Sequence, residues 1–375
     1  MPNAVPLLDF SREYQLRREE ILAALELVAD SQKFILGPEV EQFEAAAAAA
    51  LQVKHAIGCA SGTDALWLAL AAAGIGPGDE VITTPFSFFA SASAILRAGA
   101  TPIFADIDPV TFNLSPAAAE AAITPRTKAI LPVHLYGQPV DWDHFQQIAD
   151  RHKLLLVEDA AQAWGARWKQ TPAGGLGASA AFSFYPTKNL SAMGDAGMVT
   201  TNDDTIADHA RALRTHGMRQ RYFHDEIGWN ARLDSFQAAV LNVRLKYVTA
   251  GNEERAQIAE NYLHLFQQAE LVGAITLPEM LTNAHSAWHQ YVIRAPRRND
   301  LRTHLTAHKI GTEIYYPLPI HLQPALAHLG YKTGAFPHSE QAAHEVLALP
   351  IFPGLRMDEQ ELVVRRIAEF IANGG

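Results

Sequence analysis

Between residues 54 and 202 the chain alternates short apolar runs with longer segments whose apolar positions recur at helical spacing. This alternation is typical of an α/β fold, in which helices connect neighbouring parallel strands. The predicted strands are His55–Cys59, Glu80–Thr84, Pro102–Ile107, Ala129–His134, Leu154–Glu158, Ala180–Phe184 and Met198–Thr201. Right-handed crossovers would place the connecting helices, such as Asp64–Ala73 and Asp141–His152, on both faces of a mostly parallel sheet.

Beyond residue 202 long helical periods dominate the pattern. The predicted helices are Asp204–Leu213, Ser235–Val248, Glu253–Gln268 and the closing helix Asp358–Ala372. Before the closing helix, a mixed segment includes Tyr291–Arg294 and Leu301–Lys309. This change predicts a domain boundary near Thr249–Asn252. We therefore expect a large α/β domain at residues 1–250, which includes an N-terminal helical segment, and a smaller C-terminal α+β domain at residues 251–375.

Charge and composition exclude several classes of protein. The formal net charge is −10 and no long run of Lys or Arg occurs, so binding to nucleic-acid phosphates has little electrostatic support. Hydrophobic residues make up 49% and charged residues 19%, which is ordinary for a folded chain and argues against wholesale disorder. The longest apolar run, Ala65–Gly76, is shorter than the roughly 20 residues of a membrane-spanning helix. We expect neither a nucleic-acid nor a membrane partner.

The cysteine content and the first residues favour a cytoplasmic location. Cys59 is the only cysteine, which excludes an intramolecular disulfide and a cysteine-rich zinc site. The segment Met1–Phe10 has no cationic region and reaches Asp9 before an apolar core develops, unlike a secretory signal.

The segment Cys59–Leu66 leads from a predicted strand into a predicted helix. Backbone N–H groups at such a helix start, together with the helix dipole, favour an anion, so Gly62 and Thr63 could hold a phosphate. The alternative is that Ser61 or Thr63 only caps the helix. This segment alone leaves both interpretations open.

Two carboxylates close the predicted strand at residues 154–158, at the edge where open α/β sheets bind ligands. Side chains alternate along a strand, so Glu158 and Asp159 point to opposite sides and at most one of them faces a given ligand. A carboxylate at this edge favours a cationic partner. Ion pairing within the protein explains such a residue equally well.

A lysine follows the apolar strand at residues 180–184. Partial burial beside small residues would lower the pKa of the Lys188 amine and make it a better nucleophile toward a carbonyl. A lysine after a strand is more often simply solvated. Lys188 therefore indicates a reactive amine only in combination with other candidate site residues.

An anion site, a carboxylate and a lysine at the strand ends of one sheet fit pyridoxal 5'-phosphate. Its phosphate would bind at Gly62 and Thr63, its protonated ring nitrogen at Asp159, and its aldehyde at Lys188. An aromatic side chain would stack on the ring while neighbouring aromatic residues pack in the core. The candidates for that ring are Phe86, Phe88 and Phe89.

The sequence resembles the DegT/DnrJ/EryC1/StrS family of nucleotide-sugar aminotransferases from Phe34 almost to its C-terminus. Six segments in order carry the resemblance: Ser61–Leu66, Gly76–Ile82, Pro132–Gln138, Glu158–Gln162, Phe182–Leu190 and Asn230–Asp234. The resemblance implies a fold-type-I aminotransferase that forms a homodimer with its active sites at the subunit interface.

The resemblance also implies a role for each matching residue. Lys188 would be the catalytic Schiff-base lysine, Asp159 would hold the pyridine nitrogen, and Gln162 would contact the ring hydroxyl. Phosphate would be bound by Gly62, Thr63 and Ser183, and Phe88 would stack on the ring. Asn230 would reach the cofactor phosphate of the neighbouring subunit, and Arg232 would help to bind the sugar nucleotide.

Two positions depart from the family pattern. Ala231 stands where many relatives have Ser, and Tyr315 stands where many have the His of a His-Tyr-Pro triplet, which could alter a substrate contact. The nearby segment Ile320–Pro324 matches the family. Tyr315, Tyr316 and His321 are therefore candidates for the sugar side, although Tyr316 and His321 could also be packed structural residues.

The resemblance implies transamination from glutamate to a keto-sugar nucleotide, with pyridoxamine 5'-phosphate formed during the cycle. Segments 133–138 and 316–324 favour a UDP- or dTDP-linked 3-keto sugar, for surface polysaccharide, lipid A or natural-product sugars. A 4-keto substrate and a non-catalytic regulatory protein that binds the cofactor remain alternatives. A family dehydratase is disfavoured because dehydratases carry His at the position of Lys188, and a nicotinamide enzyme because no strand–G-x-G-x-x-G–helix is present.

Two histidine pairs, His304/His308 and His285/His289, have the i, i+4 spacing that can hold a metal ion. Neither lies in an H-E-x-x-H pattern, and neither has a third ligand at helical spacing. The sequence favours surface histidines, and we expect no metal site.

Overall fold

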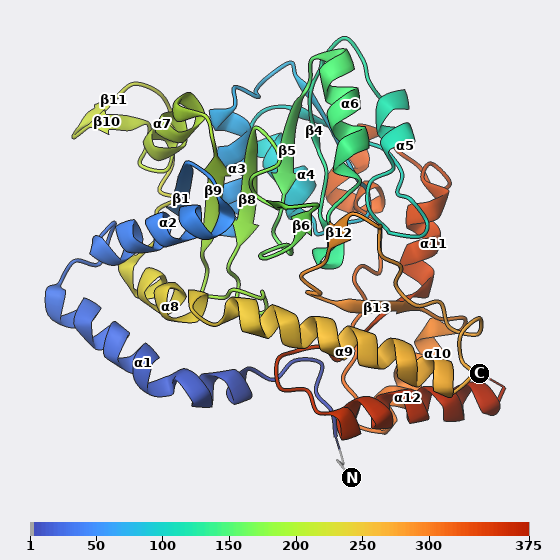
Figure 1. Ribbon diagram of the computed structural model, residues 1–375. Helices are drawn as coiled ribbons and strands as arrows, with labels where there is room; N and C mark the ends of the chain where they lie inside the picture. The colour runs from blue at the N-terminus through green and yellow to red at the C-terminus, as the bar shows by residue number, and fades with distance from the viewer. Residues whose placement is uncertain (1–3, 375) are drawn as a thin grey trace.

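The computed structural model describes residues 4–374, and its centre is a sheet of seven strands in the order β1, β9, β8, β5, β4, β2, β3 (Figure 1). The strands are β1 (His55–Cys59), β2 (Glu80–Thr83), β3 (Thr101–Phe104), β4 (Thr127–Leu131), β5 (Leu155–Asp159), β8 (Ser179–Ser183) and β9 (Gly197–Thr201). Neighbouring strands are parallel except at β9, which is antiparallel to both β1 and β8. The predicted mostly parallel sheet is confirmed.

The strand ends differ in detail from the prediction. Strand β4 ends at Leu131, and the apolar run continues beyond it only as a single bridge between Val133 and Asp159. Strand β3 ends at Phe104, although the following apolar residues are also buried. Residues beyond the last strand pairing are still buried by other elements and are therefore apolar. An apolar run in the sequence is for this reason longer than the strand itself.

Helices cover both faces of the sheet, as predicted (Figure 1). On one face Ile57 and Cys59 of β1 belong to a buried cluster with α3 (Gly62–Ala72), α4 (Ala90–Arg97) and α7 (Asp204–Leu213). Ala56, which alternates with them along β1, packs instead with α2 (Pro38–Leu51) and α8 (Ser235–Leu245). Helix α6 (Trp142–His152) covers Ile130 of β4 and Leu156 of β5 in a further cluster.

The C-terminal part has a small antiparallel pair, β13 (Tyr291–Arg294) and β14 (Val346–Leu349). Its helices are α9 (Val248–Gln268), α10 (Arg298–Ala307), α11 (Pro337–Glu345) and α12 (Met357–Ala372). These elements share one large buried cluster.

The predicted helix at residues 235–248 is in fact α8 followed by the start of α9. The boundary expected at residues 249–252 therefore falls in the first turn of α9. We keep the division into residues 1–250 and 251–375 as a proposal, although the large buried cluster of the C-terminal part also takes in Phe86, Phe112 and Tyr136 from the first part.

Two segments extend away from this body (Figure 1). Helix α1 (Phe10–Ser31) packs on α8, and the hairpin of β10 (Met218–Gln220) and β11 (Phe223–His224) projects at the upper left of the view. Both carry exposed apolar side chains, with Leu16 71% and Ile227 87% exposed on or beside them. None of the helices within residues 4–374 is long and apolar enough to cross a membrane.

The remaining short elements connect these parts. They are α5 (Pro116–Ala121), β6 (Arg167–Trp168), β7 (Thr171–Pro172), β12 (Ala284–His285) and the 3₁₀ turns Leu135–Gly137, Ile320–Leu322 and Pro324–Leu329.

Candidate active site

The N-terminus of α3 lies against the end of β8. Ser61 caps the helix, its Oγ accepting a hydrogen bond of 3.1 Å from the backbone N–H of Asp64. The helix therefore begins at Gly62, earlier than the predicted Asp64. A Cβ atom at Gly62 would lie 2.5 Å from Cβ and 2.8 Å from Oγ of Ser183, so only glycine fits there. The capping role of Ser61 is confirmed, and the structure also brings Gly62, which precedes Thr63 at the start of α3, against Ser183.

Glu158 and Asp159 point to opposite sides of β5, as the alternation predicts. The carboxylate of Glu158 accepts backbone N–H bonds from Gly174 at 2.7 Å and from Leu176 and Gly177 at 2.9 Å. It also pairs at 3.1 Å with Nε2 of the buried His134, whose Nδ1 accepts the N–H of Val140. Glu158 is thus fully engaged inside the protein and serves the fold.

Asp159 is buried, with 3% exposure, and has few protein partners. Its Oδ2 accepts a hydrogen bond of 2.7 Å from Ser91 Oγ, and its Oδ1 accepts one of 3.2 Å from the N–H of Ala161. Burial raises the pKa of Asp159, while these two donors and the charge of Lys188 oppose that rise. A buried carboxylate of this kind favours a cationic ligand.

The loop after β8 delivers Lys188, whose backbone N–H bonds to Tyr185 O at 2.8 Å. The side chain is half-buried and lines a pocket with the start of α1 and the start of α9. Burial lowers the pKa of Lys188 to about 8, against the opposing charge of Asp159. Within residues 4–374 no hydrogen bond or ion pair engages its amine.

A hydrogen-bond network fixes the residue next to Lys188. Asn189 Nδ2 donates to Ala287 O and Asn252 Oδ1, each at 2.7 Å. Because that amide nitrogen donates, Asn189 Oδ1 accepts from Nδ1 of His289 at 3.0 Å. Burial lowers the pKa of His289 well below its usual value, so its ring is neutral. The loop that carries Lys188 is therefore held by residues of the C-terminal part.

Gln162 connects the sheet edge to the segment at residues 315–316. Its Oε1 accepts the backbone N–H of Tyr136 at 2.6 Å, and its Nε2 donates to Tyr316 Oη at 3.3 Å. The Tyr136 hydroxyl in turn donates to the carbonyl of Tyr315. Phe88 is 59% exposed, and its ring centroid lies 6.3 Å from that of Tyr316. The structure thus brings Gln162, Phe88 and both tyrosines together.

Asn230 and Arg232 lie beside the loop that leads into α3. Arg232 forms an isolated bridge with Cys59, and Ala60 N–H bonds to Ala231 O at 3.0 Å. Asn230 is exposed, and the buried Nε of Arg232 has no hydrogen-bond partner among residues 4–374. Both roles remain predictions.

His321 lies in a packed environment. Its buried Nε2 pairs with Glu340 at 3.2 Å, and its ring centroid lies 4.8 Å from that of Phe336. Burial lowers the pKa of His321. These contacts explain His321 as a structural residue, and its role toward a sugar stays a prediction.

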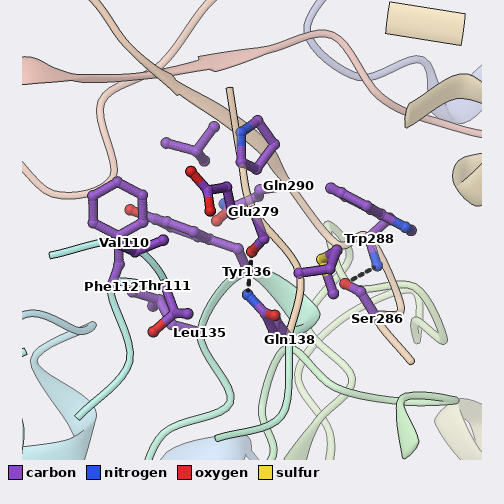
Figure 2. A pocket seen from close by; sticks show the side chains of 13 residues that line it. Val110, Thr111, Phe112, Leu135, Tyr136, Gln138, Glu279, Ser286, Trp288 and Gln290 are labelled. Atoms are coloured by element: carbon purple, nitrogen blue, oxygen red, sulfur yellow. Dashed lines mark hydrogen bonds between the residues drawn. The ribbon is translucent and has the colours of Figure 1, made fainter. Parts of the chain in front are cut away.

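A separate pocket, shown in Figure 2, lies beside Tyr136 and contains none of the predicted site residues. Gln138 closes one wall, since its Nε2 donates to Glu279 O at 3.1 Å and its Oε1 accepts from Leu281 N–H at 2.8 Å. Tyr136 joins this pocket to the candidate site, since its backbone N–H donates to Gln162 and its hydroxyl donates to the carbonyl of Tyr315.

Sequence reasoning missed Ser91, which binds Asp159 from helix α4. No local signal marks it, because a serine within a run of Ala and Ser resembles a solvated helix position. Asn189 lies within the segment Phe182–Leu190, and its hold on the Lys188 loop becomes visible only in the fold.

Comparisons with known proteins show to which family the chain belongs. The profile of the DegT/DnrJ/EryC1/StrS aminotransferase family matches residues 15–368. The chain belongs to this family. Both the predicted family and the predicted aminotransferase class are confirmed by this match, and the fold is confirmed by the likeness to a solved structure with a TM-score of 0.91.

Three relatives illustrate the family. The chain is 50% identical to the "pleiotropic regulatory protein" of Geobacillus stearothermophilus over 98% of each chain. It is 45% identical to the "dTDP-3-amino-3,4,6-trideoxy-alpha-D-glucose transaminase" of Streptomyces venezuelae, covering 98% of this chain and 96% of the relative. The crystal structure of NtdA from Bacillus subtilis "with bound cofactor PMP" superposes with a TM-score of 0.91 at 34% identity, covering 98% of this chain and 86% of NtdA.

Proposed function

We propose that this aminotransferase binds pyridoxal 5'-phosphate and transfers an amino group from glutamate to a 3-keto sugar nucleotide. One observation carries the proposal: the amine of Lys188 is half-buried, has its pKa lowered to about 8, and interacts electrostatically with the buried Asp159. Perturbed groups of opposite sign at one sheet edge are typical of an active site.

The residues present fit the cofactor. The N-terminus of α3 and the close approach of Gly62 to Ser183 offer backbone N–H groups and a hydroxyl to a phosphate. Asp159 would hold the ring nitrogen, Gln162 the ring hydroxyl, and the exposed Phe88 the ring face. When bound, pyridoxal phosphate supplies a carbonyl for the amino group and a cationic ring that withdraws electrons.

Lys188 would act as the acid and base of the reaction. A pKa of about 8 leaves a useful fraction of neutral amine near neutral pH, where it can take a proton from the α-carbon of the donor and return it elsewhere. Asp159 must stay ionised to hold a cation, and the hydrogen bond from Ser91 favours that state. The Asn189 network keeps the Lys188 loop in position.

The proposal includes a second copy of the chain. Exposed apolar residues on α1 and beside the β10–β11 hairpin, such as Leu16 and Ile227, offer a surface for it. The exposed Asn230 would then reach the cofactor phosphate of the neighbouring subunit, and Arg232 would help to bind the nucleotide. Tyr315 and Tyr316, beside Gln162, would contact the sugar.

The name of the Streptomyces venezuelae relative supports a 3-amino sugar nucleotide. The test is an amino-transfer assay with glutamate and a panel of dTDP- and UDP-linked 3-keto and 4-keto sugars, with identification of the product by mass spectrometry and NMR. We expect a 3-amino sugar and no turnover by Lys188→Ala. Faster amination of a 4-keto sugar would contradict the proposed position.

A non-catalytic regulatory role is the second candidate, favoured by the name of the Geobacillus relative. A regulator would bind the cofactor yet convert no amino donor. Single-turnover absorbance changes on addition of glutamate distinguish the two, because a spectrum that stays unchanged with every donor supports regulation.

A further inference from the structure

Three potential metal ligands converge where helices α10 and α12 pack together. His304 lies on α10 and His308 one turn later at the C-cap of that helix, and Glu369 comes from α12, 61 residues (369 − 308) further along the chain. One ligand atom from each residue lies within 4.8 Å of the other two. The sequence offered no third ligand beside the histidine pair, whereas the fold supplies one. Figure 1 shows the two helices side by side near the C-terminus.

The orientation of His308 suits a metal ligand. Its Nδ1 lies 2.9 Å from the backbone carbonyl of His304, and a carbonyl can only accept, so Nδ1 carries the proton. The lone pair of the neutral ring is then on Nε2. Histidines that bind metals in proteins commonly have their second ring nitrogen fixed in this way.

His304 provides an independent observation. Its Nε2 is buried and has no hydrogen-bond partner among residues 4–374. A buried polar atom without a partner is uncommon, and a missing ion is one of the usual reasons. The ring centroids of His304 and His308 lie 4.4 Å apart.

The ligand types and the nearby arginine restrict which metal ion this cluster can bind. Arg366 donates a hydrogen bond of 2.6 Å to Oε2 of Glu369, so the cluster has a cation of its own nearby. A hard ion such as Ca²⁺ or Mg²⁺ needs several oxygen ligands, which this cluster lacks. Two imidazoles and one carboxylate suit Zn²⁺ and related transition metals, with water in the fourth position.

We propose that His304, His308 and Glu369 bind one Zn²⁺-class divalent ion that links α10 to α12. The site would hold the C-terminal helix against its neighbour and thereby stabilise the C-terminal part of the chain. The helices α10 and α12 carry none of the residues proposed for the cofactor, so this inference does not depend on the proposed function.

The test uses the full-length protein, loaded with its cofactor, treated with a chelator and then desalted. Titration with ZnCl₂ in a calorimeter should show one ion per chain. His308→Ala and Glu369→Gln should each weaken binding at least tenfold, because each removes one ligand. The matched control is His264→Ala, which removes a histidine from an exposed His–Glu pair on α9, with 3.9 Å between Nε2 and Glu260 Oε1.

Unchanged affinity in His308→Ala, or no one-to-one binding by the unaltered protein, would overturn the proposal. A second measurement needs no variant. Crystals of the unaltered protein grown with Zn²⁺ should give an anomalous peak at the zinc edge between the three side chains. A peak only elsewhere, or none at all, would refute the site.

Discussion

The hydroxyl of Ser91 donates a hydrogen bond of 2.7 Å to the carboxylate of Asp159, and both side chains are buried. Hydrogen bonds to a charged group contribute about 1.5–3 kcal/mol, so this contact favours the ionised carboxylate that a cationic ring requires. We expect Ser91→Ala to weaken pyridoxal phosphate binding by about tenfold. Absorbance titration of the cofactor-free protein measures this affinity.

Ser93→Ala is the matched control for that variant. Ser93 lies on the same helix, and within residues 4–374 its Oγ bonds only to Ala90 O of that helix, at 3.4 Å. Its cofactor affinity should equal that of the unaltered protein. Equal affinities in all three proteins would show that Ser91 does not support Asp159.

The lowered pKa of Lys188 predicts how its reactivity depends on pH. With a pKa of about 8, the neutral fraction rises about tenfold per pH unit below 8 and is nearly complete above 9. Covalent capture of pyridoxal phosphate by the cofactor-free protein should follow this curve, measured by stopped-flow absorbance. Lys188→Ala serves as the blank. A rate that keeps rising toward pH 10 would indicate an ordinary, solvated lysine.

Gly62→Ala should damage the anion site. The new Cβ would lie 2.5 Å from Cβ of Ser183, so the start of α3 must move away from β8. We expect a loss of cofactor affinity of at least tenfold, since the backbone N–H groups leave their positions. Gly76→Ala is the control, because among the described residues a Cβ there meets only Ala98 O, at 3.9 Å. Tight cofactor binding by Gly62→Ala would show that the loop adapts.

We expect replacement of Glu158 to lower the stability of the fold, whereas Asp159 is proposed to serve cofactor binding. Glu158→Gln places an amide NH₂ where the carboxylate now accepts three backbone N–H groups and the His134 ring. We expect the free energy of unfolding to fall by ~3 kcal/mol, measured by urea denaturation. The exposed Glu361→Gln should leave it unchanged. A midpoint of denaturation shared by both variants would argue against this role.

Much of the fold follows from local sequence. The alternation of apolar runs and helical periods predicts the sheet and its covering helices, because each element must bury one face. The direction of β9 was not predictable, since a buried run reads the same whether its neighbours are parallel or antiparallel. The break between α8 and α9 was likewise hidden by a continuous helical pattern.

For the candidate site, too, some features follow from local sequence and others only from the tertiary structure. The sequence alone determined that Gly62 lies at a helix start, that Glu158 and Asp159 face opposite sides, and that Lys188 follows a strand, because these facts depend on neighbouring residues. Only the tertiary structure showed that Glu158 is occupied by backbone N–H groups and His134, that Ser91 supports Asp159 across 68 residues of chain, and that Glu369 meets the α10 histidines. Such contacts join residues far apart in the chain, and folding, not local pattern, brings them within hydrogen-bonding reach.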